Sequence, residues 1–338
     1  RRSTCRLCGS TDLTNVFSLT PTPPANAFVG EGQRDQKQQA FPLDLFFCND
    51  CAHLQLLDVV DPSELFRNYV YVSGTSASFI RHFQDYANSC VDWFGLAPGN
   101  LVIDIGSNDG TLLGFFKDKG LKVLGIDPAR TIAEEATRNG IETWPDFFNQ
   151  DIADDIIDQK GSASLVTANN VFAHADDLSG ITDSIRKILT TDGVFVFEVS
   201  YLADVYEKTL FDTIYHEHVA YHSVIPLIEF FKSKDMDLFA VERVDSHGGS
   251  LRCMVQLASG SREDDRSVDN LVAHEKRLAL DQVETWFDFA QKIDAVRDEL
   301  VDILTGLKKD GKSIASFGAP AKATTLMYHF AIGPDIID

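Results

Sequence analysis

Positive charge is scarce in this chain of 338 residues: 30 Lys and Arg stand against 51 Asp and Glu, which gives a formal net charge of −21 at pH 7. An acidic molecule repels polyanions, so the composition argues against binding DNA, RNA or an anionic membrane through the general field of the protein. It still allows a small phosphorylated ligand held by a few local Arg or Lys residues. Long apolar runs are also lacking, and none approaches the length that spans a bilayer.

Cysteine is scarce as well, with six residues in the whole chain. A chain of this length, with no apolar leader before Cys5, does not have the composition of a small secreted protein held by disulfides. We therefore expect a protein of the reducing cytoplasm. Cys90 and Cys253 lie in apolar surroundings and are predicted to be buried core thiols.

The other four cysteines form two Cys-x-x-Cys pairs, Cys5 with Cys8 and Cys48 with Cys51. Each pair can turn two thiolates toward one ion, and the two pairs together complete a tetrahedral site. A segment this short buries little apolar surface, so a metal ion is a natural way to hold it. Because four thiolates leave no open position, we predict a structural zinc ion, with loops and a short sheet between the pairs. The alternative, a redox-active pair, is disfavoured because a second pair is present.

The middle of the chain has the pattern of a Rossmann-like α/β domain. An amphipathic helix is predicted over residues 79–94, and the apolar strand that follows it runs directly into Gly106. Gly106 and Gly110 allow the backbone to come close to a ligand at the carboxyl end of that strand, where open α/β sheets bind cofactors. A second strand over 122–126 ends at Asp127, which is placed to bind ribose hydroxyls. This arrangement suits either NAD or S-adenosylmethionine (SAM).

The glycine turn favours SAM over a dinucleotide. It has the form Asp-x-Gly-x-x-x-Gly, so it lacks the glycines that seat a pyrophosphate on a helix N-terminus. Asp104 and Asp109 bring carboxylates to the turn, which suits the sulfonium and ammonium groups of SAM. Further strands are predicted over 163–168 and 194–199, and a domain of this kind without a cofactor is the alternative. The predicted cofactor-binding residues are Asp104, Gly106, Asn108, Gly110, Asp127 and Asn169.

Reactive side chains are most concentrated at residues 211–222, where three interpretations compete. His218 and His222 lie four residues apart and can hold a metal, although the His-Glu-x-x-His pattern is absent. The histidines can also be packed core residues. The third interpretation is an acid–base site in which His218, Glu217 and Tyr215 supply a base, its orienting partner and a donor for developing negative charge.

The order of the motifs resembles the sugar C-methyltransferases, which add a branching methyl group to nucleotide-linked keto-deoxysugars. The motifs that carry the resemblance are, in chain order, the two Cys-x-x-Cys pairs, Tyr-x-Tyr-x-Ser at 69–73, Gly-Ser-Asn-Asp-Gly at 106–110, Asn-Val-x-Ala-His at 170–174, Asp-Thr-Ile-Tyr-His-Glu-His at 212–218, His-Gly-Gly-Ser-Leu-Arg at 247–252 and Gly-Ala-Pro-Ala-Lys-Ala at 318–323. They span nearly the whole chain. The Tyr-His-Glu-His and Gly-Ala-Pro-Ala-Lys motifs are specific to that family, whereas the glycine turn is not.

The resemblance implies an α/β fold in three parts: a small zinc-binding domain, a central class I methyltransferase domain and the start of a C-terminal Rossmann-like domain. We place these parts at residues 1–62, 63–255 and 256–338. It also implies methyl transfer from SAM to C3 of a nucleotide-linked 4-keto-deoxysugar, with His218 as the favoured base. A monomer or weak homo-oligomer acting on a small molecule is expected. The other active-site positions that the resemblance implies are Tyr215, Glu217, His174 and Tyr69.

The chemistry of these residues agrees with such a reaction. A base removes the proton from the carbon next to a ketone, and Tyr or His donors stabilise the enolate oxygen. Two alternatives stay open: an O- or N-methyltransferase, whose nucleophile needs less activation, and a binding protein that keeps the zinc and SAM folds without turnover.

The chain departs from the family pattern in places. His222 stands where an aromatic residue is more usual, so sugar contacts there are expected to differ, and Asp104 replaces a more common Glu. A long helix is predicted over 281–309, followed by a strand over 313–317 and a helix after the turn at 318–322. These elements begin a second α/β domain that continues further in the family, so we expect a truncated chain. The segment Tyr-x-Tyr-x-Ser also alternates like a strand.

Overall fold

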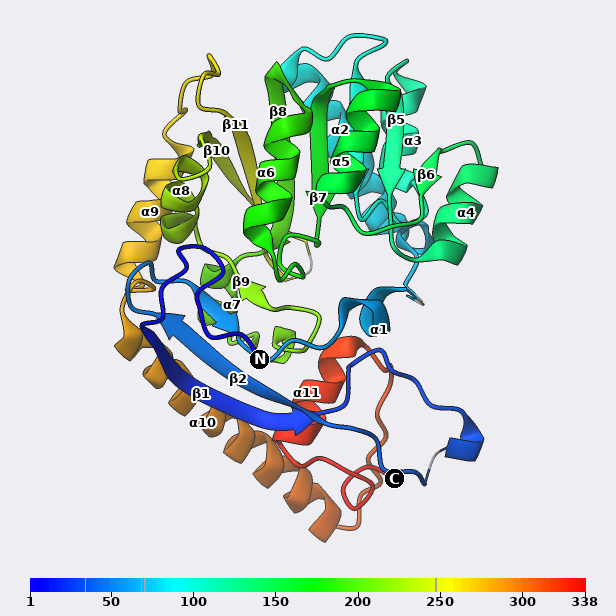
Figure 1. The fold of residues 1–338 in the computed structure, drawn as a ribbon. Helices are drawn as coiled ribbons and strands as arrows, with labels where there is room; N and C mark the ends of the chain where they lie inside the picture. Colours follow the sequence, from blue (N-terminus) through cyan, green and yellow to red (C-terminus); the bar gives the residue numbers. More distant parts are fainter. Residues whose placement is uncertain (34, 68, 70, 247) are drawn as a thin grey trace.

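The computed structural model describes residues 1–33, 35–67, 69, 71–246 and 248–338. Two β-sheets organise these residues (Figure 1). In the described part of the chain the larger sheet has seven strands, in the order β10-β11-β8-β7-β4-β5-β6. Their bounds are β4 Leu101–Ile105, β5 Lys122–Ile126, β6 Thr143–Trp144, β7 Ala163–Asn169, β8 Leu189–Ser200, β10 Met236–Val244 and β11 Ser250–Leu257.

Five neighbouring strands run parallel, in the sheet order β8-β7-β4-β5-β6. β11 is antiparallel to both of its neighbours, β8 and β10. Parallel strands need helical crossovers, which cover the sheet on both faces. Successive side chains of β4 therefore enter different cores: Val102 packs with α2 and α3, whereas Ile103 packs with α5 and α6. The bounds of the helices around this sheet are α2 Ala77–Phe94, α3 Thr111–Asp118, α4 Arg130–Arg138, α5 Gln150–Lys160, α6 Leu178–Ile188, α8 Val224–Lys232 and α9 Ser267–Arg277.

The helix predicted over 79–94 is confirmed as α2, and its ends follow from its capping residues. The Ser76 hydroxyl accepts a hydrogen bond from the Phe79 amide at the first turn. Gly95, with a φ of 62°, closes the last turn in the left-handed conformation that glycine adopts without a penalty. Cys90 on this helix and Cys253 on β11 are buried, as predicted.

The smaller sheet, in the order β1-β2-β3-β9, holds the N-terminal module, by which we mean residues 1–56. β1 (Leu13–Thr22) and β2 (Phe41–Cys48) pair in antiparallel fashion, and β3 (Leu54–Leu56) follows the second cysteine pair. The sheet predicted between the cysteine pairs is thus confirmed. Its fourth strand, β9 (Ala220–Tyr221), comes from the histidine-rich segment, which the sequence pattern does not predict.

After α9, the described part of the C-terminal region contains two more helices, both of which were predicted. α10 (Val283–Lys309) runs along β1, and α11 (Ala321–His329) contacts β1 and the 3₁₀ turn at Phe211–Thr213 (Figure 1). The strand predicted over 313–317 is wrong. The backbone hydrogen bond that Ile314 accepts is not part of a ladder, and an apolar alternation forms a strand only beside a partner strand.

The Tyr-x-Tyr-x-Ser segment lies between α1 (Pro62–Phe66) and α2, and the prediction that it is strand-like is also wrong. The Tyr71 carbonyl and the Ser73 amide, which a strand would pair with a neighbour, bind the side chain of Asn108 instead, each at 2.9 Å. Val70 and His247, which belong to two of the motifs above, lie outside the described residues. In the described residues no helix is long and apolar enough to cross a membrane.

Candidate active site

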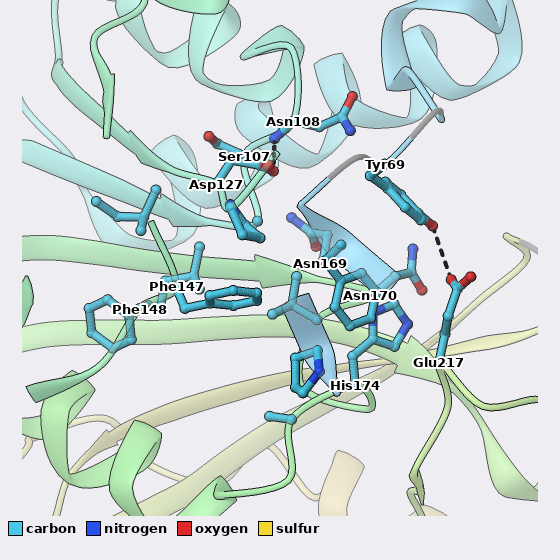
Figure 2. Close-up of a pocket in the computed structure, with 18 of the residues that line it drawn as sticks. Tyr69, Ser107, Asn108, Asp127, Phe147, Phe148, Asn169, Asn170, His174 and Glu217 are labelled. Atoms are coloured by element: carbon cyan, nitrogen blue, oxygen red, sulfur yellow. Dashed lines mark hydrogen bonds between the residues drawn. The ribbon is translucent and has the colours of Figure 1, made fainter. Parts of the chain in front are cut away.

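A cavity of about 1450 Å³ opens at the carboxyl edge of the larger sheet, beyond the ends of β4, β5 and β7. Its other walls come from α1, the segment 213–218 and residues 319–322. In the view of Figure 2, Asp127 and Phe147 lie toward one side, and Tyr69, His174 and Glu217 lie toward the other. All five predicted acid–base residues line this cavity, and so do five of the six predicted cofactor residues: Tyr69, His174, Tyr215, Glu217, His218, Asp104, Gly106, Asn108, Asp127 and Asn169.

The glycine turn shapes the cofactor side of the cavity. Gly106 has a φ of 72°, and a Cβ there would lie 2.3 Å from Cγ2 of Val171, so no other residue fits without moving the wall. The carboxylate of Asp127 accepts hydrogen bonds from the amides of Asn108 and Ala129, both at 2.8 Å. These two bonds orient the carboxylate and leave it further lone pairs for hydroxyl donors. Burial raises the pKa of Asp127, and the two amides oppose that rise.

Asp104 and Asn169 stand at the ends of β4 and β7. The Thr167 hydroxyl donates to Asp104 at 2.6 Å, and burial raises the pKa of Asp104 to about 7. The side-chain oxygen and nitrogen of Asn169 are buried without a hydrogen-bond partner among the described residues. Buried polar atoms of this kind ordinarily have partners, so their presence in a cavity wall fits a polar ligand such as SAM.

Two residues of the glycine turn do not line the cavity. Asp109 accepts hydrogen bonds from the amides of Gly74 and Thr111 and from the Thr111 hydroxyl, so its carboxylate caps the start of α3. The expectation that Asp109 faces a sulfonium is therefore wrong. Gly110 has a φ of 77° and its missing Cβ makes room for Ile141, so this glycine serves the turn into α3.

Glu217 is held from two sides. The Tyr69 hydroxyl donates to one carboxylate oxygen at 3.2 Å (Figure 2). The side-chain amide of Asn26 donates to the other oxygen at 2.5 Å. Burial raises the pKa of Glu217, and these two hydrogen bonds oppose the rise. Burial, followed by the charge of Glu217, also raises the pKa of Tyr69, so its hydroxyl stays protonated and remains a donor.

His218 has a defined tautomer. Its Nδ1 lies 2.7 Å from the carbonyl oxygen of Thr213, and a carbonyl can only accept, so Nδ1 is assigned the proton. In the neutral ring, Nε2 is then the nitrogen that can take up a proton. The ring centroid lies 4.2 Å from that of Tyr215 and 5.1 Å from that of His174. Burial raises the pKa of Tyr215, which keeps its hydroxyl protonated at neutral pH.

His174 lies between two rings. Phe66 stacks on one side with a centroid distance of 5.4 Å, and His218 stacks on the other. Burial, and secondarily the neighbouring His218, lowers the pKa of His174 well below its usual value, so the ring is neutral at pH 7. Its Nε2 is buried without a protein partner among the described residues. A neutral imidazole that lines a cavity, with a ring nitrogen that has no hydrogen-bond partner among the described residues, suits a hydrogen bond to a polar ligand.

The other two histidines of the segment face away from the cavity. His216 donates to the Phe41 carbonyl at 3.2 Å, and His222 is fully buried, with its Nε2 3.3 Å from the Phe172 carbonyl. His222 does not line the cavity, so it makes no contact with a molecule bound there. The metal site at His218 and His222 does not form either. Among the described residues, the only group of three or more potential metal ligands is the cysteine cluster.

That cluster has the geometry of a zinc site. The four sulfur atoms of Cys5, Cys8, Cys48 and Cys51 all lie within 4.8 Å of one another. Two of the separations are 3.6 Å, from Cys5 to Cys51, and 3.5 Å, from Cys8 to Cys48. A tetrahedron with Zn–S bonds of about 2.3 Å has edges of about 3.8 Å, so the four thiolates fit a zinc ion.

Comparison with known proteins agrees with this architecture. Family models match in chain order: a zinc binding domain at residues 5–66, a methyltransferase domain at 80–237 and a C-methyltransferase C-terminal domain at 245–338. The chain is 34% identical to the C-methyltransferase NovU of Streptomyces niveus over 329 residues, which are 97% of this chain and 78% of NovU. The chain belongs to the C-methyltransferase family. It is accordingly a SAM-dependent C-methyltransferase with an α/β, Rossmann-like fold.

Two of the solved structures to which the chain is similar are methyltransferases. Magnesium protoporphyrin IX methyltransferase of Synechocystis PCC 6803 is 18% identical, with a TM-score of 0.40, over 54% of this chain and 87% of its own. A SAM-dependent methyltransferase of Clostridium acetobutylicum ATCC 824 is 15% identical, with a TM-score of 0.42, over 54% of this chain and 92% of its own. These two likenesses carry no part of the family assignment, which rests on NovU and the family models.

Phe147, Lys322 and Asn26 are cavity residues of the C-methyltransferase to which the sequence alone assigns no role. Phe147 follows β6, at the same sheet edge as Asp127, and its place after a strand is a usable signal. Lys322 lies in the Gly-Ala-Pro-Ala-Lys motif, whose position beside the cavity only the fold reveals. Asn26 lies in a loop of the N-terminal module after two prolines, and no local pattern links it to Glu217.

Proposed function

We propose that the acceptor is a nucleotide-linked 4-keto-deoxysugar and that the methyl group is added to C3, next to the ketone. The observation that carries the proposal is the shared cavity: the His218 imidazole and the Gly106 turn line the same space. A base and a cofactor site must meet in this way for carbon alkylation. The motif order described above supports the sugar as the acceptor class.

The residues of this cavity suit proton abstraction from a carbon acid. A proton next to a ketone becomes removable when the enolate oxygen is stabilised. His218 takes up the C3 proton at Nε2. Its Nδ1–H group stays hydrogen-bonded to the Thr213 carbonyl, and this bond holds the ring in place. The Tyr215 hydroxyl and His174 are neutral donors beside that ring and bind the enolate oxygen. Bound SAM supplies an electrophilic methyl group.

Tyr69, Glu217 and Asn26 form the next layer of the proposal. The two hydrogen bonds on the Glu217 carboxylate fix its direction toward the cavity, where it can accept from a hydroxyl of the sugar. Asp104, Gly106, Asn108, Asp127 and Asn169 are proposed to hold SAM. Because Gly110 is behind the turn, we propose that it acts through the backbone shape alone.

The proposal includes the organisation of the chain. The four thiolates bind a structural zinc ion, and the zinc-binding, methyltransferase and C-terminal parts are divided at residues 1–62, 63–255 and 256–338. The protein acts on its small-molecule acceptor as a monomer or weak homo-oligomer.

Exchange at C3 tests the proposal without methyl transfer. We expect the protein alone to exchange the C3 hydrogen of a nucleotide-linked 4-keto-deoxysugar for deuterium in D₂O, and we expect NMR of the product formed with SAM to show a new methyl group on C3. The His218→Asn variant should lose the exchange and retain SAM binding. A methyl group found on oxygen or nitrogen would contradict carbon transfer, and wild-type exchange in His218→Asn would remove His218 from the role of base.

A further inference from the structure

Two arginines of the N-terminal module reach the loop that carries His174. Arg6 stands between the zinc-ligand positions Cys5 and Cys8, and its fully buried guanidinium forms an ion pair with Asp176 at 3.0 Å. Arg2 donates to the backbone carbonyl of Asp176 at 2.9 Å and to its carboxylate at 3.2 Å. Asp176 is therefore bound through both its side chain and its main chain.

Asp176 belongs to the loop between β7 and α6, two residues after His174. The same loop is joined to the His218 segment. The carbonyl of Ala173 accepts hydrogen bonds from the amides of Val219 at 3.0 Å and Ala220 at 3.1 Å. The loop and the segment thus bring the two stacked histidines to one another.

The N-terminal module also contacts the His218 segment. The amide of Leu56 donates to the carbonyl of Val219 at 3.0 Å, and β3 pairs with β9 directly after it. Arg6 connects these two contacts, because its guanidinium donates to the carbonyl of Leu56 and to the side chain of Gln55, both on β3. One small module thus grips the two chain segments that carry His174 and His218.

We propose that Arg6 and Arg2 are positioning residues, which hold the His174 loop against the His218 segment. They thereby connect the cysteine cluster to the side of the cavity that His174 and His218 line. A guanidinium without access to solvent needs charged and hydrogen-bonding partners. Here Nη1 donates to β3 and Nη2 is paired with the Asp176 carboxylate, whereas Nε and Nη2 make no hydrogen bond to the described residues. Because the Arg6 side chain is buried, salt screens this ion pair less than a pair whose two members are both exposed. Asp176 also lines the cavity, and Val171 of the same loop packs against Gly106, so the Kd for SAM shows whether the contact acts on the cofactor side as well. This inference rests on the roles proposed above for His174 and His218.

Three variants and a matched control test the inference. Asp176→Asn weakens the ion pair without a change in the N-terminal module, Arg6→Gln weakens it from the other side, and a double variant combines the two. Arg1→Gln is the control, because Arg1 pairs with Asp58 at 3.6 Å and does not reach the loop. For each variant, zinc content, the Kd for SAM, kcat and KM for the keto sugar, and hydrogen exchange at the Val219 and Ala220 amides are measured.

We expect Asp176→Asn and Arg6→Gln each to lower kcat/KM for the sugar by about 10- to 100-fold, because displacing a reacting group by about 1 Å costs about that much. Zinc content and the Kd for SAM should stay at wild-type values, and the Val219 and Ala220 amides should exchange faster. The loss in the double variant should be smaller than the two single losses combined, since both changes break the Arg6–Asp176 ion pair. Arg6→Lys should restore part of the lost activity.

Other outcomes overturn the inference. Additive effects in the double variant would show that Asp176 acts on the acceptor directly. Wild-type exchange at both amides in Asp176→Asn would show that the contact does not hold the loop, whatever the activity. The exchange measurement needs no substrate, so it decides the matter even if the proposed keto sugar proves to be the wrong acceptor. If Arg6→Gln loses zinc, Asp176→Asn still decides, because it leaves the module intact.

Discussion

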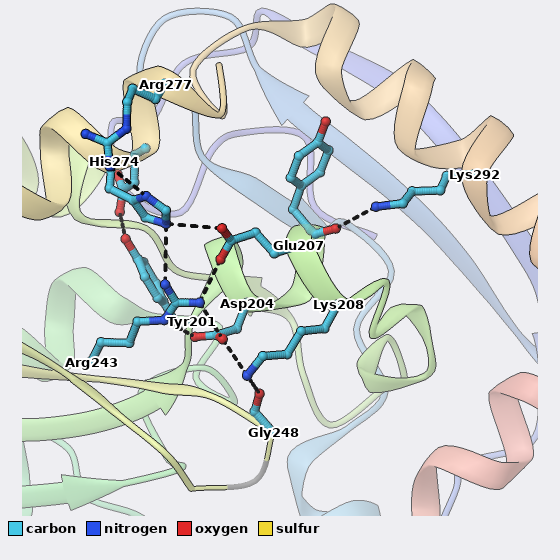
Figure 3. Close-up of polar contacts among 11 residues, drawn as sticks. Tyr201, Asp204, Glu207, Lys208, Arg243, Gly248, His274, Arg277 and Lys292 are labelled. Carbon is cyan, nitrogen blue, oxygen red and sulfur yellow. Dashed lines mark hydrogen bonds and ion pairs between the residues drawn. The ribbon is translucent and has the colours of Figure 1, made fainter.

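Two polar clusters of this C-methyltransferase differ in how fully their charges are paired. In the cluster between α7 (Leu202–Lys208), β10 and α9, the buried Asp204 carboxylate receives Arg243 at 2.8 and 3.0 Å and Lys208 at 2.7 Å (Figure 3). Arg243 also binds Glu207 and His274. We call this group the Arg243 cluster.

The cavity presents the opposite condition. Asn169 and His174 have buried atoms without a protein partner among the described residues. Asp104 accepts a hydroxyl, and burial raises its pKa to about 7. Burial also pushes up the pKa of Asp204, but Arg243 and Lys208 outweigh it and the net shift is downward. A buried polar group without a hydrogen-bond partner lowers the free energy of unfolding by about 1–3 kcal/mol. The polar groups of the cavity therefore lower stability and favour ligand binding, whereas the Arg243 cluster adds to stability.

The largest expected effect is on kcat, and it comes from making the same His→Asn substitution in each of the two regions. His218→Asn should lower kcat by about 10² to 10⁴, the usual contribution of a general base, while the Kd for SAM stays constant. His274→Asn, the same change in the Arg243 cluster, should leave kcat at the wild-type value. Steady-state kinetics and calorimetry with SAM measure both. Equal kcat values for the two variants would erase the distinction between the regions.

Removal of Arg243 should lower the stability of the protein and leave kcat unchanged. Arg243→Met leaves the buried Asp204 with Lys208 as its remaining cation, so we expect the free energy of unfolding to fall by about 2 kcal/mol. Denaturant unfolding measures the loss, and kcat per folded molecule should not change. A fall in kcat without a fall in stability would place the Arg243 cluster in the reaction.

The buried Asp104 makes stability depend on pH in a direction that follows from its pKa. Because the folded pKa of about 7 exceeds the usual Asp pKa of 3.8, the folded chain binds more protons between these values, and its stability falls as pH rises toward 7. Asp104→Asn removes that term. From pH 5.5 to pH 8 the stability of the variant should rise by about 2 kcal/mol relative to the wild type.

Unfolding curves at those two pH values give the comparison, and Asp204→Asn is the matched control. Since the folded pKa of Asp204 is lowered, its contribution is already complete above its unfolded pKa, so the control should show no relative gain over this window. Parallel behaviour of the two variants would contradict the contrast between the carboxylates.

The smallest expected effect concerns Asn169. Among the described residues its side chain has no hydrogen-bond partner to lose, so Asn169→Ala should not lower the melting temperature. The Kd for SAM should rise about tenfold, which corresponds to about 1.4 kcal/mol for one or two lost hydrogen bonds. Thermal unfolding and calorimetry on the same sample check both halves. A lower melting temperature with an unchanged Kd would make Asn169 a structural residue.

The sequence predicts those features that depend on neighbouring residues. The α2 helix, the cysteine pairs, the Gly106 turn and Asp127 at the end of the next strand each follow from a local pattern, and the structure shows them. Asp109 was misplaced because a carboxylate beside a glycine turn can cap a helix as readily as face a ligand. Spacing alone does not distinguish the two.

The remaining features depend on contacts between distant parts of the chain. Asn26 lies 191 positions from Glu217, and Arg2 lies 174 positions from Asp176. β9 is too short to show any periodicity, so its pairing with β3 cannot be recognised in the sequence. His216 and His222 belong to the same dense segment as His218, and only the course of the backbone decides which rings face the cavity.

The pairing of β3 with β9 has a consequence for biosynthesis. The N-terminal module leaves the ribosome long before residues 220–221 are synthesised. Until then β3 lies at an edge of the smaller sheet without its partner strand β9. Loop closure between such distant strands is slow, and the edge stays open to other chains in the meantime. A polypeptide released before residue 220 would keep that edge unpaired and would be prone to self-association, even with its cysteines metallated.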